Sequence, residues 1–248
     1  MPYRRLPNTD AARVRALEIV TRQQPLPGTT DCPYTPELKQ KIELFLPRFK
    51  TAILNSDAAR EKQNHNSRVH AEHTRKAKLY ISHFLQVLNL AITRGELKPA
   101  VRTYYGIDEN DPRLPSLATE QDLLQWGEKT IRGEQERLRA GGTPIYSPSI
   151  ALVRVNHENF KQSHFSQKQF QQNAARYCAE VARVRHYADQ LVLDLWNQIE
   201  AHHEHIENEL QRREACQQYG IAYVFRKTEL KRIQQQQRLD QLSPRLPF

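Results

Sequence analysis

Histidine and glutamate residues between positions 200 and 207 form the densest group of metal-ligand side chains in the sequence. Imidazole and carboxylate groups bind zinc and nickel, and ligands three or four residues apart lie on one face of a helix. One helix face supplies only part of a coordination shell, and such groups are more often solvated helix ends. Metal binding is therefore our second alternative function. Its candidate ligands are Glu200, His203, Glu204 and Glu207.

A repeated motif offers a second arrangement of carboxylates. Arg-x-x-Ala-Glu-x-x-Arg occurs at 68–75 and again at 176–183, a shift of 108 residues. Facing helices would bring Glu72 and Glu180 together as in di-metal bundles, but these also need a Glu-x-x-His motif in each half. Only the second copy has a comparable sequence, at 200–203. Ion pairing along each helix is the interpretation that we favour, and we predict no cofactor.

The excess of basic residues lies at the two ends of the chain. The net charge is +9, and residues 1–24 hold five basic and two acidic residues, while residues 226–248 hold six and two. Basic termini are able to contact phosphates, although duplex-binding proteins usually concentrate lysine and arginine on a folded element. The first alternative function is thus a nucleic-acid- or ribosome-associated protein. Its candidate contacts are Arg4, Arg5, Arg226, Lys227, Lys231 and Arg232.

Recognised catalytic motifs are missing from the sequence. It has no glycine-rich phosphate loop, nucleophile elbow or paired-carboxylate motif. Trp126 and Trp196 are more typical of packing anchors than of cofactor platforms. We therefore name no catalytic or cofactor-binding residue and favour a non-enzymatic protein.

Composition and periodicity predict helices. The 248 residues include only 8 glycines, and the mean hydropathy of -0.77 indicates a strongly polar surface. Apolar residues follow helical spacing at 38–53, 69–91 and 123–138. A heptad seam indicates helices packed at shallow angles. Its members are Phe170, Ala174, Tyr177, Val181, Val184, Ala188, Leu191 and Leu195.

Local signals predict where the helices begin and end. A short docking helix or arm is expected from Asn8 or Thr9 to about residue 23. Thr35-Pro36 and Ser147-Pro148 resemble helix starts, and Thr119 to Asp122 resembles a capping box before a helix that ends at 141–142. The seam fails at 163–166, which predicts a hairpin turn or kink there, with 147–161 as a partner helix.

The motif at 68–75 and 176–183 predicts an internal duplication, because both copies also close with Tyr-Gly-Ile, at 105–107 and 219–221. The expected fold is an all-α antiparallel bundle of two related helical segments, each either a hairpin or one very long helix. The segments that we expect are an arm at 1–34, repeat 1 at 35–107, a linker and bracing helix at 108–142, repeat 2 at 143–225 and a basic tail at 226–248.

Cysteine usage and hydropathy suggest a cellular location. Three cysteines without metal spacing favour a reducing compartment. No apolar run resembles a signal peptide or approaches the roughly 20 residues of a membrane span. We expect a cytoplasmic protein without a membrane partner.

Four segments carry a family resemblance. Residues 1–10, 79–84, 115–117 and 141–146 are similar to those of an uncharacterised bacterial protein family of comparable length. The resemblance implies no activity, since the family has no assigned function or ligand. The leading hypothesis is therefore a helical scaffold or adaptor that uses its helical faces to bind a protein partner or to self-associate.

Overall fold

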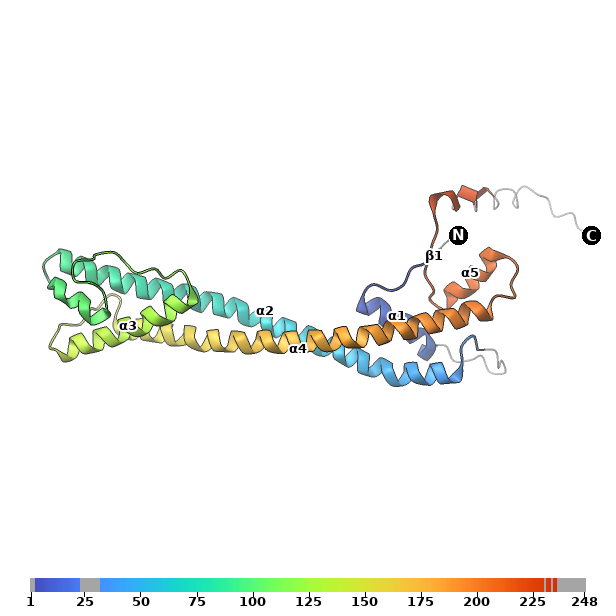
Figure 1. The fold of residues 1–248 in the computed structure, drawn as a ribbon, viewed down its shortest axis with the longest axis horizontal. Coiled ribbons are helices and arrows are strands. Elements are labelled where there is room, and N and C mark those ends of the chain that lie inside the picture. Colours follow the sequence, from blue (N-terminus) through green and yellow to red (C-terminus); the bar gives the residue numbers. More distant parts are fainter. Residues whose placement is uncertain (1–2, 23–31, 230, 233, 236–248) are drawn as a thin grey trace, which may run out of the picture. The chain divides into compact units, whose positions relative to one another are not determined.

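The protein is built almost entirely from helices, which confirms the predicted all-α class (Figure 1). The computed structural model describes residues 3–22, 32–229, 231–232 and 234–235. Within them, no helix has an apolar stretch long enough to cross a membrane. The elements are β1 (Tyr3–Arg4), α1 (Asp10–Arg22), α2 (Pro36–Thr93), the 3-10 helix η1 (Pro99–Tyr105), α3 (Glu120–Arg139), α4 (Ile150–His202), α5 (Glu209–Gln218) and β2 (Tyr223–Val224), which pairs antiparallel with β1.

Each predicted repeat is dominated by one long helix, since α2 has 58 residues and α4 has 53. The hairpin turn predicted at 163–166 is wrong, because these residues lie inside α4, while the alternative of a kink stays a prediction. Phe165 belongs to no buried face, as it is 64% exposed, and the seam continues through the polar residues Ser163 and Gln167. The predicted start at Ser147 is also wrong. Helix α4 begins at Ile150, and the Ser149 hydroxyl accepts a hydrogen bond from the backbone N–H of Leu152, three residues later.

The chain forms two compact units. Unit 1 comprises Met1–Asp57 with Tyr177–Phe248, and unit 2 comprises Ala58–Arg176. Parts of α2 and α4 therefore belong to each unit. The internal duplication and the five-segment division remain predictions.

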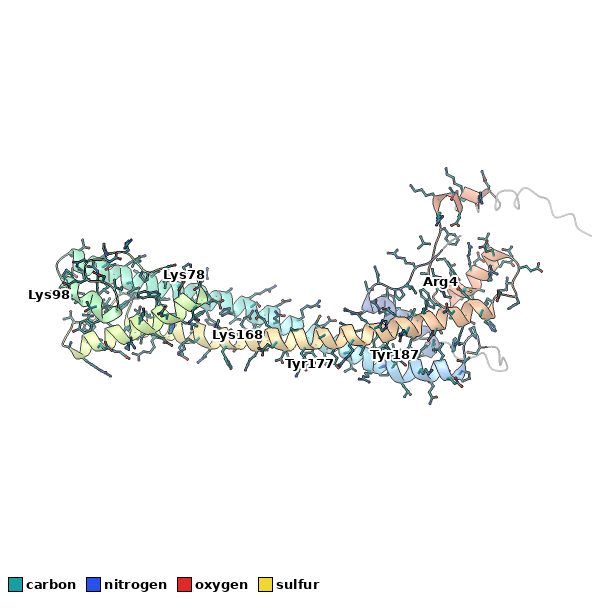
Figure 2. All side chains as sticks on the ribbon, in the orientation of Figure 1. Arg4, Lys78, Lys98, Lys168, Tyr177 and Tyr187 are labelled. Atoms are coloured by element: carbon teal, nitrogen blue, oxygen red, sulfur yellow. The ribbon has the colours of Figure 1, made fainter. Side chains whose placement is uncertain are left out.

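In unit 1, the first part of α2 runs antiparallel to the last part of α4. The backbone N–H of Thr35 donates to Gln198 Oε1 at 2.8 Å. Ten residues further along α2, Phe45 packs edge-on against Tyr187, with ring centroids 4.9 Å apart (Figure 2). The predicted heptad seam is confirmed here, because Ala188, Leu191 and Leu195 are buried in the unit 1 core.

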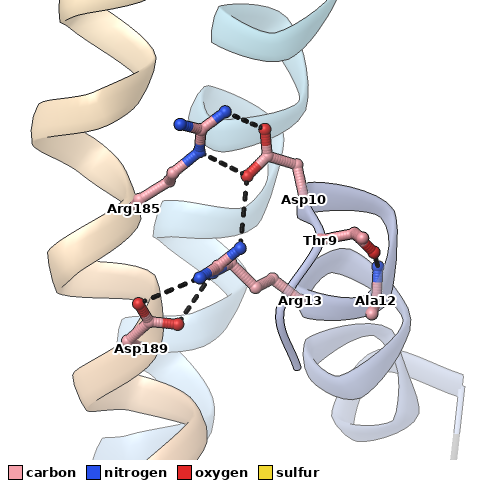
Figure 3. Close-up of polar contacts among 6 residues, drawn as sticks. All are labelled: Thr9, Asp10, Ala12, Arg13, Arg185 and Asp189. Carbon is pink, nitrogen blue, oxygen red and sulfur yellow. Dashed lines mark hydrogen bonds and ion pairs between the residues drawn. The ribbon is translucent and has the colours of Figure 1, made fainter. Parts of the chain in front are cut away.

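Helix α1 is docked on α4 by apolar packing and by ion pairs. Leu17 is fully buried in the unit 1 core. Asp10 lies 2.7 Å from the Arg185 guanidinium, and Arg13 Nε lies 2.7 Å from Asp189 Oδ1 (Figure 3). The hydrogen bond from Arg185 holds the pKa of Asp10 below its usual range despite partial burial. The first helix is thus part of the folded unit, and Thr9 caps it by accepting from the N–H of Ala12.

In unit 2, α3 packs on η1 next to α2 and α4. Gly133 permits a close approach, because a Cβ atom there would lie 2.5 Å from the Tyr104 carbonyl oxygen. The fully buried Tyr105 hydroxyl donates to Glu134, whose carboxylate also binds Arg137 at 2.7 Å. The predicted capping box is confirmed, since Thr119 Oγ1 accepts from Asp122 N–H and the Asp122 carboxylate accepts from Thr119 N–H.

Candidate metal centre

Two histidines and a glutamate from three helices meet in unit 2. Their ligand atoms all lie within 4.8 Å of one another. Among the residues that the structure describes, these three side chains form a group that could hold a metal ion. His70 Nε2 lies 2.9 Å from Glu120 Oε1, and His164 Nδ1 lies 2.7 Å from Glu120 Oε2. We call His70, Glu120 and His164 the three-ligand cluster.

Each member is fixed by the helix that carries it. His70 lies on the face of α2 that packs against α4, with its ring stacked on Phe160 at a centroid distance of 5.8 Å. Glu120 is the first residue of α3, and the Thr119 capping box sets the start of that helix. His164 follows Ser163 on α4. Three different elements therefore position one small group of side chains.

Polar side chains continue the α2–α4 contact beside the cluster. Asn66 donates to Gln167 Oε1 at 3.0 Å, and the Gln167 amide donates to Ser67 Oγ at 2.8 Å. These polar residues lie where α2 and α4 contact each other, at positions that apolar side chains occupy elsewhere along the two helices. Because each amide and hydroxyl has a specific partner, this layer favours one register of the two helices around the cluster.

The hydrogen bonds of Ser163 determine which nitrogen of His70 is a donor. Ser163 Oγ donates to the carbonyl oxygen of Phe160 at 2.9 Å, so it is an acceptor toward His70 Nδ1, also 2.9 Å away. The proton on Nδ1 leaves the lone pair of Nε2 directed at Glu120 Oε1. Two acceptor atoms at 2.9 Å repel each other unless a cation lies between them, either a second ring proton or a metal ion.

Glu120 is suited to the role of an anionic ligand. When the His70 ring also carries a proton on Nε2, its hydrogen bond lowers the pKa of the Glu120 carboxyl against the opposing effect of burial, and His164 lowers this pKa further. The carboxyl is therefore ionised at neutral pH. Exposure rises across the cluster, from 9% for the His70 side chain to 22% for His164 and 47% for Glu120. One side of the cluster thus faces solvent.

The candidate ligands predicted from sequence have other interactions. Glu200 accepts a hydrogen bond from the Tyr223 hydroxyl at 2.6 Å and pairs with Arg4 at 3.3 Å. His203 Nδ1 donates to the carbonyl oxygen of Ile199 at 2.8 Å. The structure describes Glu204 and Glu207 near the end of α4 but does not place them in a three-ligand group. In the repeated motif, Glu72 pairs with Lys76 at 2.7 Å.

The predicted nucleic-acid contacts occupy the paired strands and the segment after them. Arg4 is engaged within unit 1, because it donates to Asn197 at 2.7 Å and pairs with Glu200 (Figure 2). The side chain of Arg5 is exposed, and its backbone N–H donates to Ala222 O at 2.7 Å. The other four candidates, Arg226, Lys227, Lys231 and Arg232, are exposed residues that follow β2.

Sequence reasoning missed the three-ligand cluster because its members are far apart in the chain. His70 and Glu120 are separated by 50 positions, and Glu120 and His164 by 44. Two signals did point to these places. The capping box located Glu120 at a helix start, and the failure of the apolar seam near 163 marked the polar layer.

No protein-family model matches the chain, and neither a curated protein nor a solved structure matches it. The function is therefore argued from the chemistry and geometry of the cluster itself.

Proposed function

We propose that the protein is a metal-binding helical bundle that holds one divalent ion of the zinc class in the three-ligand cluster. The observation that carries this proposal is the meeting of His70 Nε2, His164 Nδ1 and the Glu120 carboxylate within 4.8 Å, with the other ring nitrogen of His70 held by Ser163. Histidines that bind metals typically donate their other ring N–H to a neighbouring acceptor, which fixes the tautomer. Ser163 provides that hydrogen bond to His70.

The distances require only a small movement on metal binding. Zinc bonds to nitrogen and oxygen are about 2.0–2.2 Å long, so tetrahedral ligand atoms lie about 3.4 Å apart. His70 contacts Oε1 of Glu120 at 2.9 Å and His164 contacts Oε2 at 2.7 Å. Binding through one oxygen therefore requires the carboxylate to turn, and these contacts to widen by roughly half an ångström. Glu120 is able to make this adjustment because its side chain is half exposed and lies at the end of a helix.

A bound ion would have a structural consequence and leave one position free. Two nitrogens and one oxygen fill three of the four sites of tetrahedral zinc, and water would take the fourth on the solvent side. The ion would also connect α2, α3 and α4 within unit 2. The proposed function is therefore a metal-stabilised bundle with one exchangeable coordination position.

Zinc and cobalt titrations of the metal-stripped, untagged protein test this proposal. We expect one ion per chain, and the cobalt complex should show the intense visible bands of four-coordinate Co²⁺. Replacement of any ligand, by His70→Gln, Glu120→Gln or His164→Gln, should remove high-affinity binding. His83→Gln is the matched control on α2, since His83 is exposed and outside the cluster. His203→Gln tests the site predicted from sequence.

Two results would contradict the proposal. One is a wild-type protein that takes up no zinc at micromolar concentration. The other is full zinc binding by all three ligand variants. If, in addition, His203→Gln alone lost zinc binding, the metal would be assigned to the end of α4 instead.

The scaffold or adaptor role is our second proposal. Support comes from large apolar side chains that lie exposed on α2 and α4 in unit 2, including Leu79 at 59%, Val155 at 57% and Phe165 at 64%. Self-association through such faces is measured by sedimentation equilibrium, and Phe165→Glu should weaken it. A wild-type protein that is monomeric at every concentration would exclude self-association.

A further inference from the structure

A cavity in unit 1 lies beside α1, well away in sequence from the three-ligand cluster. Its volume is about 360 Å³, within the range of small-molecule sites. The walls are formed by the segment 5–8, one face of α1, Trp196 of α4 and the turn at 220–222. Most of the lining is apolar, including Leu6, Pro7, Ala12, Ala16, Ile19 and Trp196.

The charged groups of the cavity are all positive. Arg5 and Arg15 line it, and no acidic residue does. Neighbouring arginines on and around α1 each have a carboxylate partner, whereas no ion pair is found for the Arg5 or Arg15 side chain within the described ranges. Two unpaired guanidinium groups beside an apolar cavity favour an anion with an apolar body. Figure 3 shows two of these neighbouring pairs, Arg13 with Asp189 and Arg185 with Asp10. Arg22 pairs with Glu18 on α1.

A buried donor in the lining has no acceptor. Trp196 is 2% exposed, and its indole Nε1 has no hydrogen-bond partner among the residues that the structure describes. Because this nitrogen atom has almost no accessible surface, Trp196 contributes the apolar part of its ring to the lining. Another part of the lining is closely packed, because a Cβ atom at Gly220 would lie 2.1 Å from Ile19 Cδ1.

We propose that this cavity binds a small organic monocarboxylate with an apolar body. The hydrocarbon part lies between α1 and Trp196, and the carboxylate pairs with Arg5 and Arg15. The cavity shares no residue with the three-ligand cluster, so a test of carboxylate binding here is independent of a test of the metal site.

Tryptophan fluorescence provides a direct test, because the chain has two tryptophans and only Trp196 lines the cavity. Trp126→Phe leaves Trp196 as the single reporter. The probes are octanoate, 1-octanol and octylamine, which share one chain and differ in charge, each used below its aggregation concentration. We expect a saturable change in emission with octanoate, binding of octanol that is about tenfold weaker, and no saturable response to octylamine.

Three variants in the same background locate the binding site. Arg5→Gln and Arg15→Gln should each raise the octanoate Kd about tenfold, since each removes a charge-assisted hydrogen bond. Ala12→Phe should abolish binding by filling the cavity. Arg22→Gln is the matched control, because Arg22 is on α1 but does not line the cavity. Circular dichroism verifies that each variant is folded.

Several results would overturn the proposal. They are no saturable response to octanoate, equal affinity for the three probes, or an octanoate Kd that neither Arg5→Gln nor Arg15→Gln changes. Equal weakening by Arg22→Gln would assign the effect to overall charge and would overturn it as well.

Discussion

Replacement of Ser163 by alanine tests the proposed role of the His70 tautomer without removing any metal ligand. The Ser163 side chain is buried and has two hydrogen bonds, one accepted from His70 Nδ1 and one donated to Phe160 O. Without the hydroxyl, the Nδ1 proton of His70 has no acceptor, and an unpaired buried donor costs about 1–3 kcal/mol. The ring avoids this cost by moving its proton to Nε2, where Glu120 accepts it.

That proton shift makes His70 a poor metal ligand. An Nε2 atom that carries a proton cannot bind zinc, so binding would require the unfavourable tautomer. Loss of a hydrogen-bond partner that orients a metal ligand typically lowers metal affinity by about 10–100-fold, or about 1.4–2.8 kcal/mol. We expect this increase in the zinc Kd for Ser163→Ala, with a smaller change in the stability of the metal-free protein.

Competition with a chromophoric zinc chelator measures the Kd, and a second serine serves as the control. Ser82 also donates to a backbone carbonyl oxygen three residues earlier, at Leu79, but it does not contact a histidine. Ser82→Ala should therefore bind zinc as the wild type does. Zinc affinity of Ser163→Ala within twofold of the wild type would refute the tautomer argument, as would equal losses in both variants.

Three further predictions concern stability. The pKa of Glu120 is depressed in the folded protein, so its contribution to the free energy of unfolding is present above about pH 4.5 and is lost as the pH falls through the lowered pKa. In chemical denaturation without metal, the stability of Glu120→Gln should therefore fall less on acidification than that of the wild type. An equal fall in both proteins would contradict this. Arg137→Met leaves the buried carboxylate of Glu134 without its cation and should destabilise the protein by about 3–5 kcal/mol in urea titrations, whereas the double variant with Glu134→Leu should recover part of the loss. Leu17→Ala creates a cavity under α1 and should cost about 2–5 kcal/mol; a loss below 1 kcal/mol would show that α1 is not docked.

Helix termini with side-chain caps were predictable because they depend on neighbouring residues. The starts at Thr35 and Thr119 were found from a hydroxyl followed by proline and from a capping box. The Tyr-Gly-Ile stops were found for the same reason, and both Gly106 and Gly220 have positive φ, at 70° and 80°. Glycine adopts this conformation without the steric penalty of a Cβ atom.

Predictions failed at two places on α4. The hydroxyl–proline signal at Ser147 marks a turn, and the helix begins three residues later, at Ile150. Around Ser163 and Gln167 the helix contact is polar, so the loss of apolar spacing was interpreted as a turn although α4 continues. Phe165 added to the error, because a large apolar residue was assumed to be buried and is instead exposed. Hydrogen bonds between side chains on two helices maintain the contact there, and a single-helix pattern does not reveal them.

The sequence by itself determined the helical class, the limits of α1 and α3, the start of α2 and the buried seam of α4, because these follow from local propensity, capping and spacing along one helix. Only the tertiary structure decided which distant residues meet. His70, Glu120 and His164 come from three helices, and the register of α2 against α4, together with the start of α3, brings their ligand atoms within 4.8 Å. That register depends on packing and hydrogen bonds between helices, which spacing along one helix does not reveal. The histidine-rich segment at 200–207 is therefore a different set of residues from the three-ligand cluster.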